Sequence, residues 1–134
     1  MTASYHIDHD LKLLTIVAEG VITDTDYFAF RANIHRDPGF NDTELRIYDI
    51  RTMTKLEFST FSLWKFAYEA LMKAGARRVF VTAPEIPHDL KAAFQLLRMI
   101  QGKSTHIATD MGEAWRWLGL PADRMPAADA RIAA

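Results

Sequence analysis

The sequence contains no cysteine, which excludes disulfides, thiolate nucleophiles and thiolate metal sites. Its formal net charge of −1 supplies no excess of basic residues for binding nucleic acid. No apolar run approaches the roughly 20 residues that a membrane-spanning helix needs. The first residues, Met1–His6, form neither the basic nor the apolar segment of a secretory signal. We therefore expect a cytoplasmic protein that neither binds nucleic acid nor inserts into a membrane.

The length of 134 residues is typical of one domain, and a chain of this size buries roughly two thirds of its unfolded surface. A hydrophobic fraction of 49% is sufficient for such a core. The last residues are rich in alanine and contain Pro126. We predict one domain over residues 1–121 and a loosely ordered tail over residues 122–134.

Two strand patterns open the chain, and later apolar runs alternate with stretches of helical period. This order is typical of an α/β domain with a mostly parallel five-stranded sheet and an N-terminal antiparallel hairpin strand, covered by about four helices. Turn and cap residues set the boundaries, with a polar loop expected at Arg51–Lys55. The predicted strands are Tyr5–Asp8, Leu11–Glu19, Leu45–Ile50, Arg78–Ala83 and Thr105–Thr109, and the predicted helices follow Thr23, Ser59, Pro87 and Asp110.

The predicted helix Ser59–Ala74 has an unusually wide apolar surface, because only Lys65, Glu69 and Lys73 form a charged stripe along it. Neighbouring helices could cover the flanks of this surface. Alternatively, the flanks bind a partner protein or a second copy of the chain, since aromatic residues dominate such interfaces. The residues predicted to bind the partner are Trp64, Tyr68, Phe61 and Met72.

The sequence contains no motif of a known catalytic or metal site, so we expect no enzyme activity, no cofactor and no metal. His6, Asp8 and His9 lie close together in sequence, but strand alternation places only His6 and Asp8 on the same side, and His9 lies in the turn. In parallel sheets, ligands meet the loops after the strands. At such a strand-end loop, Asp49 and Arg51 are the best candidates for polar groups of a site.

The beginning of the second predicted helix carries three hydroxyl side chains, Ser59, Thr60 and Ser62. A phosphate on any of them would lie at a helix N-terminus, where negative charge is favourable. They are therefore possible phosphoacceptors. Ser59 and Thr60 also suit simple capping of the helix.

The order of elements resembles the STAS fold of sulfate transporters and anti-sigma-factor antagonists, whose single-domain members are the SpoIIAA-like proteins. Tyr48-Asp49-Ile50-Arg51 leads through a short connection into a helix that starts with Ser and Thr, and Glu113–Pro121 is similar to the last helix of small uncharacterised bacterial proteins of this type. The resemblance implies a right-handed strand–helix superhelix, no catalysis, and regulation through binding. In true antagonists a serine at this helix start is phosphorylated, but Ser59–Ser62 departs from their Asp-Ser-Ser-Gly-like stretch.

Three hypotheses follow, of which we favour a regulatory module that acts through protein–protein interaction, with another protein or with a second copy of itself as a homodimer. The alternative is a carrier of a small apolar or lipid-like ligand, because this type of fold also resembles the lipid-binding CRAL-TRIO domains. The third hypothesis is a small enzyme, which needs polar side chains that converge on one site; Asp49, Arg51 and His88 are the candidates. The carrier instead needs an internal cavity. The residues expected to line the carrier's cavity are Phe61, Phe66, Phe94 and Met99.

Overall fold

The structure is a computed structural model that describes residues 3–62, 65, 76–86, 88–101 and 104–126. The strands are β1 (Ala3–Asp8), β2 (Leu13–Thr23), β3 (Leu45–Glu57), β4 (Arg77–Val81) and β5 (Thr105–Ala108). The helices are α1 (Asp24–Arg36), α3 (His88–Gln101) and α4 (Met111–Leu118), with short 3-10 turns η1 (Phe40–Asp42) and η3 (Ala122–Arg124). Residues 60–62 and 65 are also helical.

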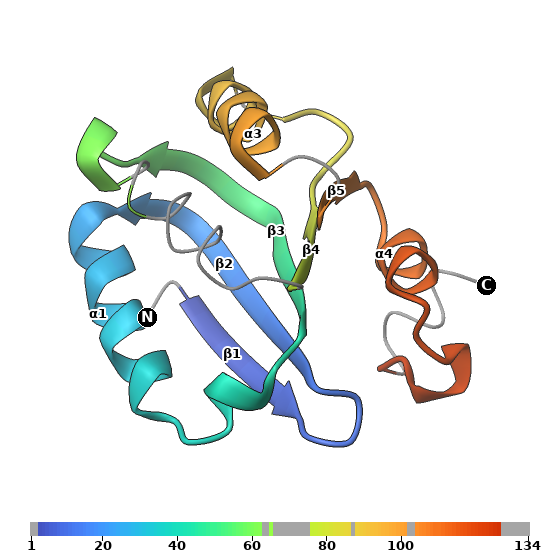
Figure 1. The fold of residues 1–134 in the computed structure, drawn as a ribbon. Coiled ribbons are helices and arrows are strands. Elements are labelled where there is room, and N and C mark those ends of the chain that lie inside the picture. The colour runs from blue at the N-terminus through green and yellow to red at the C-terminus, as the bar shows by residue number, and fades with distance from the viewer. Residues whose placement is uncertain (1–2, 63–64, 66–75, 87, 102–103, 127–134) are drawn as a thin grey trace.

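The five strands form one mixed sheet in the order β1-β2-β3-β4-β5. β1 pairs antiparallel with β2, and the other neighbours are parallel, as the sequence predicted. Helix α1 and helix α4 lie on opposite faces of the sheet (Figure 1). On the α1 face, α3 packs against β3 and β5. The sheet is therefore covered on both sides, which explains its predominantly apolar strands.

The α4 face of the sheet holds the first hydrophobic core cluster. Its buried members come from four strands and α4, with Met125 packed at the edge. Trp115 is the largest of them and is only 4% exposed. Burial of such a side chain contributes about 2–3 kcal/mol to stability, so this cluster anchors α4 on the sheet. The cluster comprises Leu13, Ile47, Val79, Val81, Ala108, Met111, Ala114, Trp115 and Leu118.

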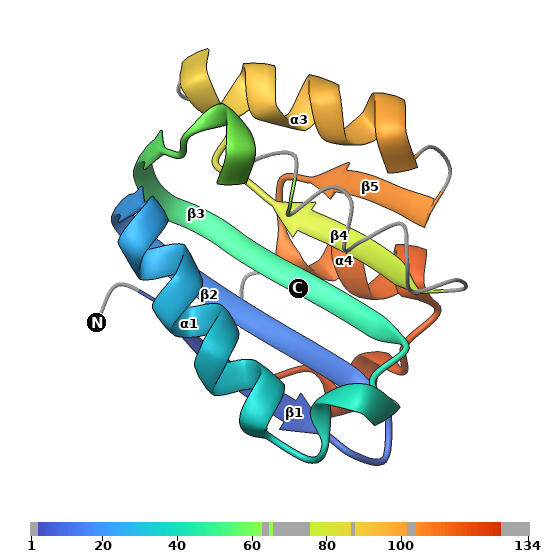
Figure 2. The same cartoon turned by 60° about the vertical axis from the view of Figure 1, so that its left-hand side comes forward.

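Strands β2 and β3 continue beyond the end of β4 as a two-stranded ribbon (Figure 2). The prediction of a loop at Arg51–Lys55 was wrong, because these residues lie within β3. The register between β2 and β3 shifts on both sides of Glu19-Gly20, so β3 contains extra residues. These bulges interrupt the alternation of polar and apolar side chains, which is why the polar segment resembled a loop. Gly20 adopts a positive φ of 67° at this irregularity.

The predicted caps at Thr23 and Asp110 are present. Thr23 Oγ1 accepts from the Asp26 N–H at 3.2 Å, and the Thr23 N–H donates to Asp26 Oδ2 at 3.0 Å. Asp110 Oδ1 accepts from the Glu113 N–H at 2.7 Å. These bonds satisfy N–H groups that a helix leaves unpaired at its start. Helix α4 then ends at Gly119, in the left-handed conformation with φ 72°.

The first residues of the predicted tail contact the domain. Arg124 Nη2 lies 3.3 Å from Asp8 Oδ2 and 3.7 Å from Asp10 Oδ2, and Met125 packs against the α4-side core. Residues 127–134 lie outside the described part of the chain, so the loose order expected of the tail stays a prediction for them.

Candidate functional site

An open cavity of about 170 Å³ lies on the α1 face of the sheet. Its floor consists of side chains at alternate positions of β2 and β3, and α1 and α3 supply walls. The ribbon of β2 and β3 extends this floor beyond β4. The apolar and aromatic lining residues are Ala3, Ile16, Ala18, Ile22, Tyr27, Phe30, Tyr48, Ile50, Met53, Leu56, Phe58, Phe80, Leu90 and Ala93.

The cavity is elongated along α1. Its lining runs along this helix from Asp26 to His35, roughly 14 Å at 1.5 Å per residue. Tyr27 lies towards the N-terminal end of that stretch, and its ring centroid is 5.0 Å from that of Phe58. This end of the cavity is therefore aromatic.

The other end is basic. Arg31 and His35 line it from the second half of α1, and Arg46 lines it from the beginning of β3. The Arg46 guanidinium carbon lies 4.7 Å from the centroid of Phe40, and the same ring contacts His35 at 4.8 Å. Among the described lining residues the single carboxylate is Asp26, which is already bonded to Thr23 in the cap of α1. The two ends therefore differ in both charge and polarity.

Arg46 is the most unusual side chain of the cavity, because it is only 9% exposed. Its Nε–H has no hydrogen-bond acceptor among the described residues. A buried N–H without an acceptor costs about 1–3 kcal/mol of stability. Such a group is expected to serve a purpose other than stability.

A second buried arginine lies beside Arg46. Arg78 of β4 stands opposite Arg46 in the parallel register and is 1% exposed. Its Nη1 approaches the Ala76 carbonyl oxygen at 3.5 Å, and it also forms a hydrogen bond with Tyr48. Burial lowers the pKa of Arg78, the neighbouring Arg46 lowers it further, and Tyr48 opposes both effects. Two guanidinium groups on one sheet face make this part of the interior electropositive.

Of the four residues predicted to bind a partner, the structure describes Phe61. Phe61 is 68% exposed, and the Lys65 Nζ lies 5.9 Å from its ring centroid and 5.7 Å from that of Phe28. Trp64, Tyr68 and Met72 lie outside the described residues, so their role stays a prediction.

Of the four residues expected to line a carrier's cavity, the structure describes the side chains of two. Phe61 and Met99 are 68% and 82% exposed, and neither lines the cavity. The side chains of Phe66 and Phe94 lie outside the described ones. The sequence therefore allowed a cavity but assigned two of its residues wrongly, because helical periodicity does not determine which flank of a helix a neighbour covers.

The predicted phosphoacceptors lie at a helix start that the Ser59 side chain caps, as the sequence predicted, and Asp24 of α1 accepts a further hydrogen bond there. The Ser59 N–H donates to Asp24 Oδ1 at 2.8 Å, and Ser59 Oγ accepts from the Ser62 N–H at 3.2 Å. The hydrogen bond from the Ser59 N–H is the main cause of a lowered pKa at Asp24. Ser59 and Thr60 are exposed, whereas Ser62 is fully buried. A carboxylate therefore already occupies this helix start.

Asp49 and Arg51 do not form a strand-end loop, because both lie within β3. Arg51 Nε and Nη2 donate to Asp49 Oδ1 and Oδ2 at 2.9 and 2.8 Å. This bidentate pair satisfies both groups. It leaves little for a ligand to bind.

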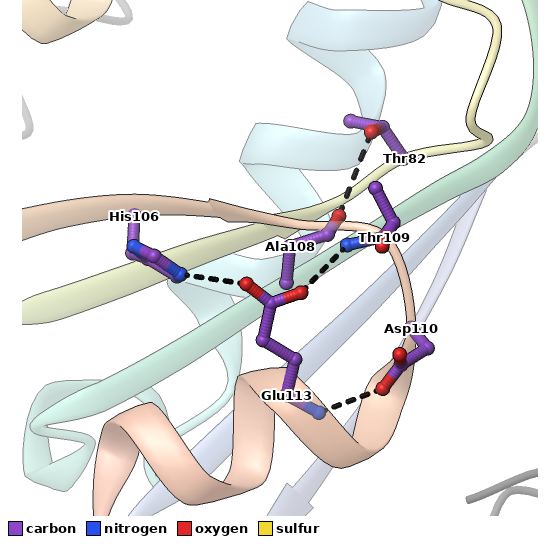
Figure 3. Close-up of polar contacts among 6 residues, drawn as sticks. All are labelled: Thr82, His106, Ala108, Thr109, Asp110 and Glu113. Atoms are coloured by element: carbon purple, nitrogen blue, oxygen red, sulfur yellow. Dashed lines mark hydrogen bonds and ion pairs between the residues drawn. The ribbon is translucent and has the colours of Figure 1, made fainter.

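Figure 3 shows a polar network where β5 meets α4. His106 Nε2 lies 3.2 Å from Glu113 Oε1, while the Thr109 N–H donates to Glu113 Oε2 at 3.2 Å. The His106 ring also stacks on Trp117 with centroids 5.1 Å apart. These contacts hold α4 against the edge strand. Within the described ranges, no three His, Asp or Glu side chains come close enough together to bind a metal.

A second hollow, of about 460 Å³, lies between the β1–β2 turn and the residues around η1. Its lining combines both signs of charge, and its ion pair between Lys12 and Glu44, 3.6 Å apart, is largely exposed. An exposed pair of this kind contributes little to binding or stability. The cavity beside α1 is therefore the stronger candidate site.

A solved structure shares this architecture. It is an uncharacterized protein of the DUF3478 family from Shewanella loihica PV-4, with a SpoIIAA-like fold. The two structures superpose with a TM-score of 0.62 and share 17% sequence identity. The match covers 87% of this chain and 93% of the other chain. This chain has a SpoIIAA-like fold. No protein-family profile and no curated protein matches it. At such low sequence identity the structural similarity establishes the fold alone, so function has to be inferred from the residues of the site.

Over the described residues, none of the helices has the length and apolar character needed to cross a membrane. Sequence reasoning missed Arg46, although a signal was present: Arg46, Tyr48 and Ile50 alternate on one face of the strand predicted over Leu45–Ile50.

Proposed function

We propose that this protein is a non-catalytic binding module that holds a small apolar ligand in the cavity beside α1. The observation that carries the proposal is the open cavity of about 170 Å³ with a predominantly apolar lining. An apolar cavity of about 150 Å³ accommodates benzene. The space beside α1 therefore suits a single ring or a short hydrocarbon chain.

Support for a role without catalysis comes from the lining itself. The described lining is predominantly apolar, and its single carboxylate, Asp26, is already bonded to Thr23 in the cap of α1. Binding sites of this kind combine apolar walls with a few polar groups that orient the ligand. The basic end supplies such groups.

A pair of adjacent alanines on α3 provides the test. Ala93 lines the cavity and is 6% exposed, whereas Ala92 is exposed. We expect 1-octanol to raise the melting temperature of the wild-type protein and of the Ala92→Leu variant, since a ligand that binds the folded state stabilises it. In Ala93→Leu the added side chain fills the cavity, so the response to octanol should be lost. An equal response in both variants would place the ligand elsewhere.

Protein–protein interaction, which the sequence favoured, is the second candidate, and exposed aromatic side chains support it. Phe61 and Phe28 are 68% and 37% exposed and flank Lys65. Exposed apolar groups of this kind are typical of interfaces. Native mass spectrometry separates the two candidates, because a monomer that carries a small adduct supports the carrier and a dimer without added mass supports the interaction module.

A further inference from the structure

The basic end of the cavity contains a buried charge that the fold itself does not use. Arg46 is 9% exposed, and its Nε–H lacks an acceptor among the described residues. Its described contact is with the face of Phe40, and this contact provides no acceptor for the Nε–H. Buried cations are normally paired with an anion.

The surroundings of Arg46 reinforce this demand for an anion. Arg31 and His35 line the same end, and Arg78 is the register partner of Arg46 on the next strand. The carboxylate of Asp26 lies at the far end of the lining along α1 and is bonded to Thr23. The described part of the cavity thus has more positive than negative charge, with the excess at one end.

We propose that the ligand is a small apolar carboxylate, whose carboxylate accepts hydrogen bonds from Arg46 while its hydrocarbon part extends along α1 towards Tyr27 and Phe58. This inference rests on the proposed function of the cavity and specifies the class of ligand. A guanidinium matches the planar, two-oxygen geometry of a carboxylate. The elongated apolar lining matches a short acyl chain.

The test compares two ligands with the same chain length and different head groups. Calorimetric titrations of the wild-type protein at pH 7 use sodium octanoate, which is ionised, and 1-octanol, which is neutral. We expect octanoate to bind at least about tenfold more tightly, because hydrogen bonds to charged groups are the stronger ones. Arg46→Met should remove this preference and leave octanol binding largely unchanged.

Arg36→Met is the matched control, because Arg36 is exposed near the end of α1 and does not line the cavity. This control should retain the wild-type preference. The resonance of the Arg46 Nε–H provides a second readout that does not depend on the variants. It should shift with octanoate and remain in place with octanol.

The possible failures are distinguishable. Equal binding of octanoate and octanol by the wild-type protein, or a preference that survives in Arg46→Met, would overturn the carboxylate inference and leave the cavity as an apolar binding site. Binding of neither ligand would overturn the proposed function and this inference with it. If Arg46→Met fails to fold, the wild-type titrations and the Nε–H resonance still decide the question.

Discussion

Replacing Arg46 with methionine should stabilise the ligand-free protein. The substitution keeps an unbranched side chain and removes a guanidinium that is 9% exposed and whose Nε–H has no acceptor among the described residues. Removing this unsatisfied group is worth about 1–3 kcal/mol. It also removes the electrostatic repulsion between Arg46 and Arg78, which lie side by side on the neighbouring strands β3 and β4.

The main loss is the contact with Phe40, where the guanidinium carbon lies 4.7 Å from the ring centroid. A cation–π contact contributes about 1 kcal/mol, and a methionine sulfur near the same ring recovers about 0.5 kcal/mol. The balance is a stabilisation of about 1 kcal/mol, which corresponds to an increase in melting temperature of about 4 °C for a domain of this size.

Urea unfolding followed by circular dichroism measures this difference, after denaturing mass spectrometry has shown that each sample is free of ligand. Arg36→Met serves as the control and should change the free energy of unfolding by less than about 0.5 kcal/mol, because Arg36 is exposed. Destabilisation of Arg46→Met by 1 kcal/mol or more would refute the reasoning. It would mean that Arg46 is already satisfied without a ligand.

Two further predictions concern the frame around the cavity. Asp37 accepts hydrogen bonds from the Gly39 N–H at 2.9 Å and the Tyr5 hydroxyl at 2.8 Å, and these bonds, the Gly39 one above all, lower its pKa from the ordinary 3.8. Because the unfolded chain binds this proton more readily, the contribution of Asp37 is present above its unfolded-state pKa and is lost as pH falls through the lower folded-state pKa. Asp37→Asn should therefore flatten the fall of melting temperature in acid, and parallel curves would contradict this expectation. Gly20→Ala should lower the free energy of unfolding, measured with urea, by about 1 kcal/mol, because φ at this position is 67°. A Cβ there would meet nothing within 4 Å, so backbone strain is the only cost. Unchanged stability would show that the strand relaxes around the bulge.

The succession of strands and helices along the chain, the mixed sheet and the caps of α1 and α4 could all be predicted from the sequence. Each depends on local signals, namely apolar runs, the hairpin, and cap residues such as Thr23 and Asp110. The second half of β3 could not be predicted, because its bulges interrupt the alternation that identifies a strand. Local patterns contain no information about the register of a distant partner strand.

The candidate site was even less predictable from local sequence signals than the second half of β3. Arg46 packs against Phe40 and lines the cavity together with α1. The tertiary path of the chain brings these elements near Arg46, and the periodicity of the strand contains no sign of them. A charged residue in a strand is normally read as an exposed one. Burial of Arg46 is therefore a tertiary property, and so is the cavity that α1, α3 and the sheet form together.

The likeness to SpoIIAA-like proteins suggested a phosphorylated serine at the helix that begins near Ser59. The geometry of this helix start argues against a simple transfer of that role. Asp24 already binds the Ser59 N–H at 2.8 Å, so a phosphate on Ser59 would place its negative charge beside a carboxylate with a lowered pKa. Like charges at such a distance repel, and the helix start loses its advantage for a phosphate. Helix α1 instead links two features, since its first residue caps that helix start and its later residues line the cavity. Helix α1 therefore connects the cavity to the helix start that precedes Phe61, through the hydrogen bond between Asp24 and the Ser59 N–H.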